Sequence, residues 1–171
     1  MNIFYLDHNP TICVQYYNDK HVVKQILETA MMLCTAHRLL DGEKINKNYK
    51  LFDSSLEKTL YKASWINHPC SKWIRESSEN YLWTYNLFLQ LGYEYTLRYK
   101  KVHKCIVVLG SLLKNLPKNI KVGLFTQPYK AMPSDCILET SIDSYRLYYK
   151  NYKSQESKWT WSFPRSKPSW C

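Results

Sequence analysis

The sequence predicts an all-α protein: a single compact helical domain over residues 1–171, with a short N-terminal arm and an aromatic, basic C-terminal tail. The first reason is that apolar side chains recur with the 3.6-residue period of a helix in several long segments. The second is that 4 glycines are too few for a turn-rich β-sandwich or a dinucleotide-binding fold. The third is that 171 residues with 45% hydrophobic content can bury one core, which excludes a disordered chain.

The N-terminal half predicts an arm followed by one long helix. Residues 2–6 are apolar and aromatic and end in an Asp-His-Asn-Pro turn, so we expect an extended arm there. Asn18 or Asp19 can cap a helix over residues 20–40, on whose apolar face His37 is expected as a core histidine. The other expectations for this half are short helices over residues 11–17 and 54–61 and a solvated loop over residues 43–50.

The C-terminal half predicts a second long helix and a long ordered loop. Pro69 suits a first helical position, and the helix should run to about residue 91, with a break at Gly92. Its expected buried stripe is Cys70, Trp73, Ile74, Ser77, Tyr81, Tyr85, Phe88 and Leu91. Prolines punctuate residues 116–133, which we interpret as an ordered loop, either a lid or a scaffold. Further helices are expected over residues 101–115 and 141–153, before a tail that contains Trp159, Trp161, Phe163 and Trp170.

The charge balance indicates a polyanionic partner. Lys and Arg number 24 against 14 Asp and Glu, which gives a formal charge of +10. Such a charge suits nucleic acid or an anionic membrane. A membrane is disfavoured because no stretch approaches the roughly 18 to 20 apolar residues of a spanning helix, and the first residues lack a signal-peptide pattern. Nucleic acid is therefore the expected partner, and the alternative is a generally basic surface without such a partner.

The six cysteines favour a reduced, intracellular chain without a metal site. They lie about thirty residues apart, contain no CxxC pair, and are accompanied by no N-x-S/T sequon. Cys34, Cys70 and Cys105 fall on apolar helix faces, where a thiol behaves as a small hydrophobe. His21 and Glu28 are about 10 Å apart along a helix axis, too far to share an ion unaided. Asp7 and His8 could complete such a set, but no HExxH-like spacing supports one, so we expect neither metal nor cofactor.

The first candidate site is the start of the first long helix. His21, Lys24 and Glu28 stand at positions i, i+3 and i+7 of one helical face. The positive end of the helix dipole lowers the pKa of a cationic group there and favours a bound phosphate. A lysine tuned in this way can act as a base or nucleophile, with Glu28 as its acid/base partner. The alternative interpretation is an ordinary solvated polar face.

Three further groups are candidate nucleic-acid contacts. His68, Lys72 and Arg75 stand at the start of the second long helix, although His68 could be only a cap on a charge-laced surface. Basic side chains also gather near His103 and in the tail, where flat rings can stack on bases; the alternative for the tail is that its tryptophans pack on the core. The members of these two groups are Lys100, Lys101 and Lys104, and Trp159, Trp161, Arg165 and Lys167.

The order of four stretches resembles a known family. They are MNIFYLDHNP, DKHVVKQILETA, NHPCSKWIRESSENYLW and KWTWSFPRSKPSW. Together they resemble the pyrimidine-dimer DNA glycosylases of the phage endonuclease V type, and the chain is also similar to uncharacterised proteins of large phages and giant viruses. The resemblance implies an all-helical enzyme without cofactor or metal that acts on duplex DNA. It also implies an N-terminal amine that forms a Schiff base at the sugar, a helix glutamate beside it, and a flipped base.

Carried onto this sequence, the resemblance implies specific roles. Glu28 becomes the acid, and His21 and Lys24 become phosphate or sugar contacts, while His68, Arg75 and the tail grip a kinked duplex. Asn2 follows Met1, and a residue of that size usually leaves the methionine in place. The nucleophile would then be the Met1 amine, with an ordinary pKa of about 8, or else Lys24 or Lys20. The expected catalytic set is Met1, His21, Lys24 and Glu28.

The expected function is a base-excision-type glycosylase and abasic-site (AP) lyase acting on damaged or modified DNA. We expect a monomer located in the cytoplasm, which for a viral protein means the host cytoplasm or the viral replication site. One alternative is a nucleic-acid-binding module without activity. Another is an enzyme acting on a nucleotide-sized ligand, with the loop over residues 116–133 covering its pocket. The catalytic interpretation requires Met1, His21, Glu28 and His68 to converge in one cleft.

Overall fold

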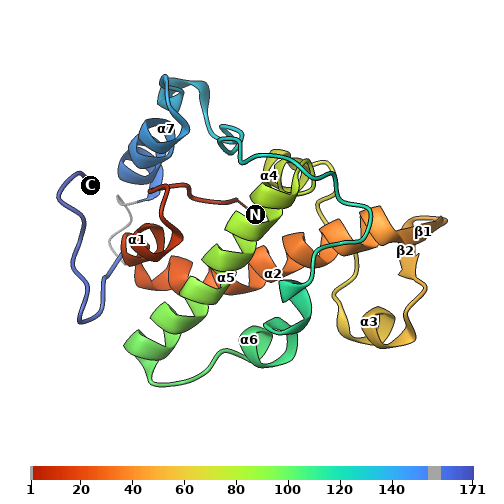
Figure 1. Cartoon of the computed structure of the whole chain (residues 1–171). Coiled ribbons are helices and arrows are strands. Elements are labelled where there is room, and N and C mark those ends of the chain that lie inside the picture. Colours follow the sequence, from red (N-terminus) through yellow and green to blue (C-terminus); the bar gives the residue numbers. More distant parts are fainter. Residues whose placement is uncertain (1, 154–158) are drawn as a thin grey trace.

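Two long helices cross at the centre of the computed structural model, which describes residues 2–153 and 159–171 (Figure 1). They are α2 (Asp19–Asp41) and α5 (Ser78–Tyr99). Each begins at a side-chain cap, because Asn18 accepts a hydrogen bond from the His21 amide and Ser77 accepts one from the Asn80 amide. The core lies between them and includes Ile26, Leu33, Trp73, Tyr81, Phe88 and Leu91.

Short helices surround this pair. α4 begins at a cap provided by His68, whose Nδ1 accepts from the Cys70 amide, and α6 begins at the same kind of cap provided by His103. Among the described residues, no helix is both long enough and apolar enough to span a bilayer. The short elements are α1 (Pro10–Gln15), α3 (Ser54–Thr59), α4 (Pro69–Ile74), α6 (Lys104–Leu109), α7 (Ser141–Tyr148), the 3₁₀ turns Leu112–Lys114 and Ser134–Cys136, and the π turn Tyr149–Lys153.

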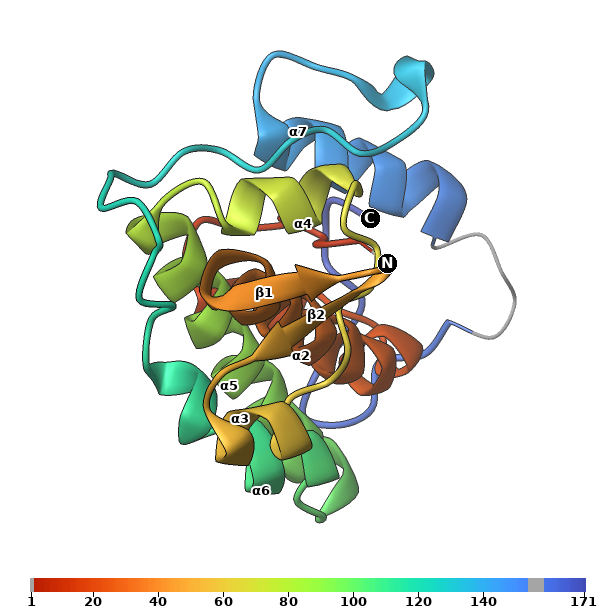
Figure 2. The same ribbon diagram turned by 90° about the vertical axis from the view of Figure 1, so that its right-hand side faces the viewer.

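The fold is mostly helical but not all-α, which corrects the predicted loop over residues 43–50. β1 (Gly42–Ile45) and β2 (Asn48–Leu51) pair antiparallel, with Gly42 opposite Leu51 (Figure 2). Asn46 closes the turn with φ of 55°, a left-handed backbone that asparagine adopts more readily than most residues. The base of the hairpin is held because Arg38 donates to the Tyr49 carbonyl and Glu57 accepts from the Leu51 amide. These contacts come from outside the segment, so its composition did not reveal them.

The predicted helix over residues 69–91 is in fact two helices. The chain leaves the helical path at Arg75–Ser77, where Ser77 caps α5. The predicted buried stripe is confirmed, since all eight of its side chains are buried. The predicted break at Gly92 is wrong: α5 continues through it, and Ile106 of α6 packs so closely that an added Cβ would lie 2.6 Å from its side chain. Gly92 therefore permits a close helix contact rather than a turn.

The predicted helix over residues 101–115 is in the structure the shorter helix α6, followed by a 3₁₀ turn.

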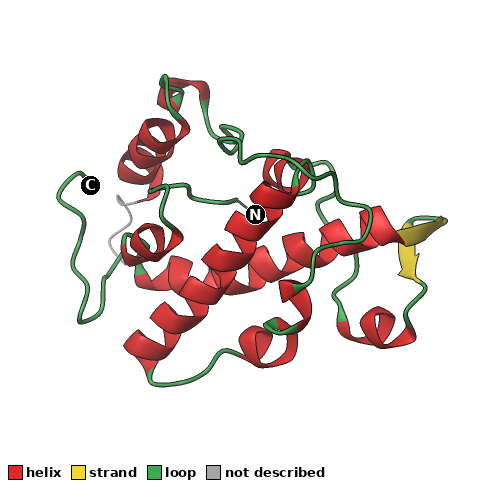
Figure 3. Cartoon of the chain, viewed as in Figure 1, coloured by secondary structure: helices red, strands yellow, loops and turns green. Residues whose placement is uncertain are grey.

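The long loop is fastened to the helices as a scaffold (Figure 3). Thr126 is its anchor, because its amide donates to Asn80 Oδ1 over 2.9 Å and its carbonyl accepts from the Trp73 indole over 3.1 Å. The Ser78 amide donates to the Lys121 carbonyl over 2.9 Å. Trp73 and Asn80 are fully buried. These hydrogen bonds tie the loop to α4 and to the start of α5, and we assign it the scaffold role.

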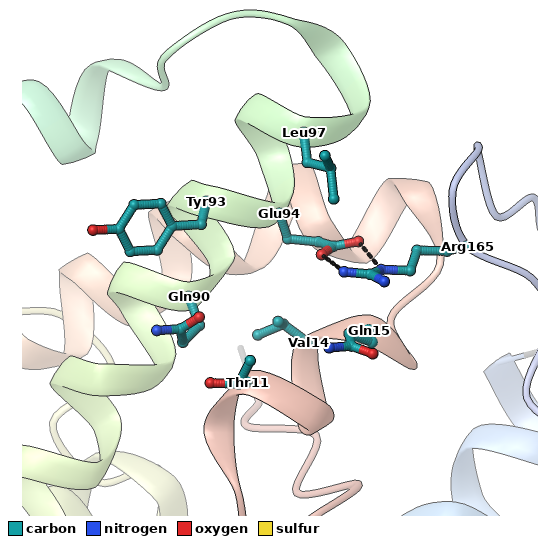
Figure 4. Close-up of a pocket in the computed structure, with 8 residues that line it drawn as sticks. All are labelled: Thr11, Val14, Gln15, Gln90, Tyr93, Glu94, Leu97 and Arg165. Atoms are coloured by element: carbon teal, nitrogen blue, oxygen red, sulfur yellow. Dashed lines mark hydrogen bonds and ion pairs between the residues drawn. The ribbon is translucent and has the colours of Figure 1, made fainter.

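The tail from residue 159 docks on the start of α2. Asp19 accepts hydrogen bonds from the Thr160 hydroxyl over 2.7 Å and from the Ser162 amide over 3.0 Å. Farther along, Arg165 makes a bidentate pair with Glu94 of α5, both contacts being 2.9 Å (Figure 4). Glu94 also accepts from Arg98 Nε over 2.7 Å. A network of buried charges thus holds the tail to the body, beside a cavity of about 230 Å³.

This docking predicts an acid-sensitive contribution to stability. Burial alone would raise the pKa of Asp19, but hydrogen bonds from Ser162, Thr160 and Arg98 outweigh it and lower that pKa. Since the pKa of the folded state lies below the unfolded value of about 3.9, the contribution is full above that pH and is lost as the pH falls through the folded pKa. Urea unfolding from pH 7 to pH 3 should show Asp19→Asn less stable than the wild type at pH 7, with the gap closing below about pH 4. A gap that stays constant with pH would contradict this account.

Candidate active site

A polar cavity of about 270 Å³ gathers residues of the N-terminal arm, α2, the α4 cap, the long loop and α7. We call it the polar cleft. Helix α2 contributes four of the lining residues, and the others come from segments far apart in the sequence. The residues that line the polar cleft are Asn2, Phe4, His21, Lys24, Gln25, Glu28, His68, Ala131, Tyr148 and Lys153.

The predicted face of α2 forms the floor of the polar cleft. His21, Lys24 and Glu28 lie on it together, as their spacing predicted. The alternative of an ordinary solvated face is wrong for two of the three, since His21 is 8% exposed and Glu28 is 9% exposed. His68 reaches the same cavity from the start of α4. Met1 lies outside the described residues.

Glu28 is the central carboxylate of the polar cleft. Its Oε2 accepts from Gln25 Nε2 over 3.0 Å and from the Asn2 amide over 3.3 Å. Its Oε1 lies 3.4 Å from Lys24 Nζ, whose own side chain is largely exposed. The carboxylate is thereby oriented between the arm and a lysine, a position from which it can exchange protons with an amine on either side.

The arm is held in place by residues of the C-terminal third. Asn2 Nδ2 donates to the Ala131 carbonyl over 2.9 Å, and Asn2 Oδ1 accepts from the Tyr145 hydroxyl over 3.1 Å. The Cys70 thiol donates to the same oxygen over 3.1 Å. These contacts fix Asn2, and with it the described end of the arm, beside the polar cleft.

His21 is a buried, neutral imidazole. Its ring stacks on Phe4 with centroids 4.4 Å apart, and its Nδ1 lies 2.8 Å from the Tyr149 hydroxyl. Burial lowers the pKa of His21 to about 3, assisted by the charges of Lys153, Lys24 and Lys20. The predicted lowering is therefore confirmed for His21, with burial as its largest cause. At neutral pH, His21 is therefore an uncharged hydrogen-bonding group in the lining of the polar cleft.

The remaining predicted DNA contacts lie outside the polar cleft. Lys72 is exposed on α4. Arg75 is half-buried, and its guanidinium donates hydrogen bonds to the carbonyls of Ser71 and Ile66, each over 2.9 Å. Lys100, Lys101 and Lys104 are exposed between the end of α5 and the start of α6, and Lys167 is exposed in the tail. For the exposed lysines a DNA contact stays a prediction. Arg75 is engaged in holding the turn before α4.

The aromatic tail serves mainly as packing, the alternative left open by the sequence. Trp161 is half-buried and donates its indole N–H to the Tyr16 carbonyl over 3.0 Å. Trp159 stands edge-on to His21, with centroids 4.8 Å apart. Arg165 is committed to Glu94. These three side chains make contacts within the protein, and for them a contact with DNA stays a prediction.

No metal cluster is found in the part of the chain that the structure describes, where no three His, Cys, Asp or Glu side chains come close enough to hold an ion. The six cysteines are free, and Cys34, Cys70 and Cys105 are buried, as predicted for thiols on apolar helix faces.

Several residues of the site had no signal in the sequence. Asn2, Ala131, Tyr148 and Lys153 line the polar cleft, yet they belong to segments that the sequence described only as an arm, a loop and a last helix. Tyr145 and Tyr149 contact the arm and His21 from behind the cavity wall. In a chain with 15 tyrosines, nothing local distinguishes these two.

A buried carboxylate beside a lysine is able to exchange a proton with a nearby amine. Residues 1–107 match the family described as pyrimidine dimer DNA glycosylase, and the chain belongs to this family. Membership implies a DNA glycosylase, with DNA as the substrate, and confirms the resemblance noted in the sequence. No curated protein and no solved structure matches the chain.

Proposed function

We propose that the protein is a base-excision DNA glycosylase with AP-lyase activity on damaged double-stranded DNA, with pyrimidine dimers as the first candidate lesion. The observation that carries the proposal is the contact between the Asn2 amide and Glu28 Oε2 inside the polar cleft. Residue 1 is bonded to Asn2, and we propose its amine as the nucleophile that Glu28 serves as proton partner. Family membership supports the same chemistry.

The proposed reaction replaces a C–N bond of the nucleotide by a C–N bond to the protein. The neutral amine attacks C1′ of the deoxyribose, the bond from C1′ to the base breaks, and the base leaves with the electron pair and takes up a proton. Opening of the sugar ring then gives an imine between the amine nitrogen and C1′. Loss of a C2′ proton from this imine expels the 3′ phosphate and cuts the strand. Glu28 is the group placed to give and take these protons.

The charges around the polar cleft support a phosphate-bearing substrate. Lys24 and Lys153 line it, and Lys20 is close enough to lower the pKa of His21. Positive charge at this rim attracts the DNA backbone. A free nucleotide is the weaker candidate, because the cavity is about 270 Å³ and the long loop contributes only Ala131 to its lining while Thr126 ties the loop to α5.

Borohydride trapping tests the proposal and identifies the nucleophile. With ultraviolet-irradiated or abasic duplex DNA, we expect a covalent adduct, since borohydride reduces the imine to a stable amine. Peptide mapping by mass spectrometry should place the adduct on residue 1. Inserting one asparagine between Met1 and Asn2 leaves a large residue after the methionine, which therefore stays in place, and displaces its amine by about 3.8 Å; this variant should abolish trapping.

The outcomes separate the possibilities. An adduct on Lys24 or Lys20 overturns the terminal amine as nucleophile but keeps the enzyme. No adduct and no strand cleavage, with tight and salt-dependent DNA binding, would instead support a nucleic-acid-binding module.

A further inference from the structure

We propose that Tyr149 is a positioning residue that fixes His21 as the neutral tautomer with its proton on Nε2, so that His21 donates a hydrogen bond to a backbone oxygen of the bound DNA strand. Tyr149 lies in the π turn Tyr149–Lys153, beyond the residues that match the family. The inference rests on the proposed function for its ligand. It rests on the geometry alone for the state of His21.

The argument begins with the Tyr149 hydroxyl, which is fully buried. Its oxygen accepts a hydrogen bond from the Asn18 amide over 2.9 Å. Burial raises the pKa of Tyr149 well above its usual value, so the hydroxyl keeps its proton. His21 Nδ1 lies 2.8 Å away and is the acceptor that this proton meets. Tyr149 therefore donates to Nδ1.

A second donor faces the same ring nitrogen. Asn18 Oδ1 accepts from the His21 amide over 2.9 Å, which settles the orientation of the Asn18 carboxamide and turns its NH₂ group toward the ring. Asn18 Nδ2 lies 3.5 Å from His21 Nδ1. With two donors directed at it, Nδ1 must carry the lone pair. A neutral imidazole has one proton, so that proton is on Nε2.

The surroundings of His21 keep it neutral and immobile. Phe4 stacks on its face, and Trp159 and Tyr149 stand against its edges with centroids 4.8 and 5.2 Å away. The charged groups that face it are Lys20 and Lys24 on its own helix and Lys153 on the π turn, and all three oppose a further positive charge. Since Nδ1 is occupied, Nε2 is the polar ring atom that His21 can offer to the polar cleft it lines.

A donor of this kind has a defined use beside lysines. The three lysines attract a phosphate by their charge, and this attraction does not fix how the phosphate is oriented. An N–H group on a stacked ring, in contrast, donates along one direction and so fixes the position of the oxygen that it binds. A donor that needs no reorganisation during the reaction stabilises charge that develops on an oxygen. The C-terminal third thus completes the site: Tyr145 holds the arm, and Tyr149 sets the hydrogen-bonding role of His21.

Nitrogen-15 NMR of the histidine rings tests the tautomer in the wild-type protein, without DNA. Between pH 5 and pH 8, we expect His21 to show a protonated Nε2 and an unprotonated, hydrogen-bonded Nδ1, with no titration. A proton on Nδ1, or titration to the doubly protonated ring in this range, overturns the inference. The measurement does not depend on activity, so it can hold even where the proposed glycosylase activity fails.

Tyr149→Phe tests the consequence and keeps the ring packing. We expect His21 to lose its single tautomer and the single-turnover cleavage rate at saturating DNA to fall about tenfold, with less than a twofold change in DNA affinity. Losing a preorganised donor outright costs more than this, and here the donor is only misdirected part of the time. The matched control is Tyr152→Phe in the same turn, whose hydroxyl instead contacts Asp135. An unchanged tautomer and rate in Tyr149→Phe would overturn the role of Tyr149.

Discussion

Replacing Glu28 with glutamine is expected to lower the rate of strand cleavage by about a thousandfold, the scale of a lost acid/base group. Glutamine has the same shape and can still accept from the Asn2 amide and from Gln25, so the polar cleft should keep its form. It cannot take up a proton from an amine or return one. Single-turnover cleavage of an irradiated or abasic duplex measures the effect, and DNA affinity should change by less than threefold.

The matched control for Glu28 is Glu79→Gln. Glu79 is exposed in the first turn of α5, outside the polar cleft, so this change removes the same charge without touching the site. Its cleavage rate should equal that of the wild type. Equal rates for Glu28→Gln and the wild type would remove Glu28 from the reaction, whereas parallel losses in both variants would indicate a general charge effect.

Replacing Glu94 with glutamine is expected to lower the free energy of unfolding by about 3 kcal/mol, because it breaks a buried network of charges. Glu94 is 3% exposed and pairs with both Arg98 and Arg165. In this variant, Arg98 would still form its ion pair with Asp19. The Nη2 atom of Arg98, however, already has no hydrogen-bond partner within residues 2–153 and 159–171. Urea unfolding at pH 7, followed by circular dichroism, measures the loss.

An exposed ion pair provides the comparison. Lys62 pairs with Glu57 and is 68% exposed, so Lys62→Met should change stability by about 1 kcal/mol or less. If Glu94→Gln and Lys62→Met cost the same, the buried network would contribute no more than a surface pair, and the anchoring of the tail would have to come from the hydrogen bonds of Asp19 and the packing of its rings.

The active-site face of α2 could be predicted because its information is local. A helix brings positions i, i+3 and i+7 to one side whatever surrounds it, so His21, Lys24 and Glu28 had to lie together. The same reasoning fixed the buried stripe from Cys70 to Leu91, although the chain breaks within it. Periodicity reports which side chains face the core and is less informative about where a helix ends.

The elements that were missed depend on contacts between distant segments. The hairpin of β1 and β2 is stabilised by hydrogen bonds from Arg38 and to Glu57. Gly92 allows the close packing of Ile106 and does not form a turn. Arg75 and Arg165 carry the positive charge that a DNA contact needs. Within the fold, however, Arg75 donates to backbone carbonyls and Arg165 pairs with a carboxylate. Composition gives the number of cations and cannot show which are neutralised inside the fold.

By itself, the sequence determined a mostly helical, basic protein, the residues of one polar helix face, and membership of the pyrimidine dimer DNA glycosylase family. Tertiary structure alone decided how that face is completed. The arm reaches Glu28, Tyr145 holds Asn2, and Tyr149 meets His21, across separations of 26 to 143 residues. The physical reason is that helix period acts within a few residues, whereas a buried hydroxyl or amide finds its partner only when the whole chain has packed.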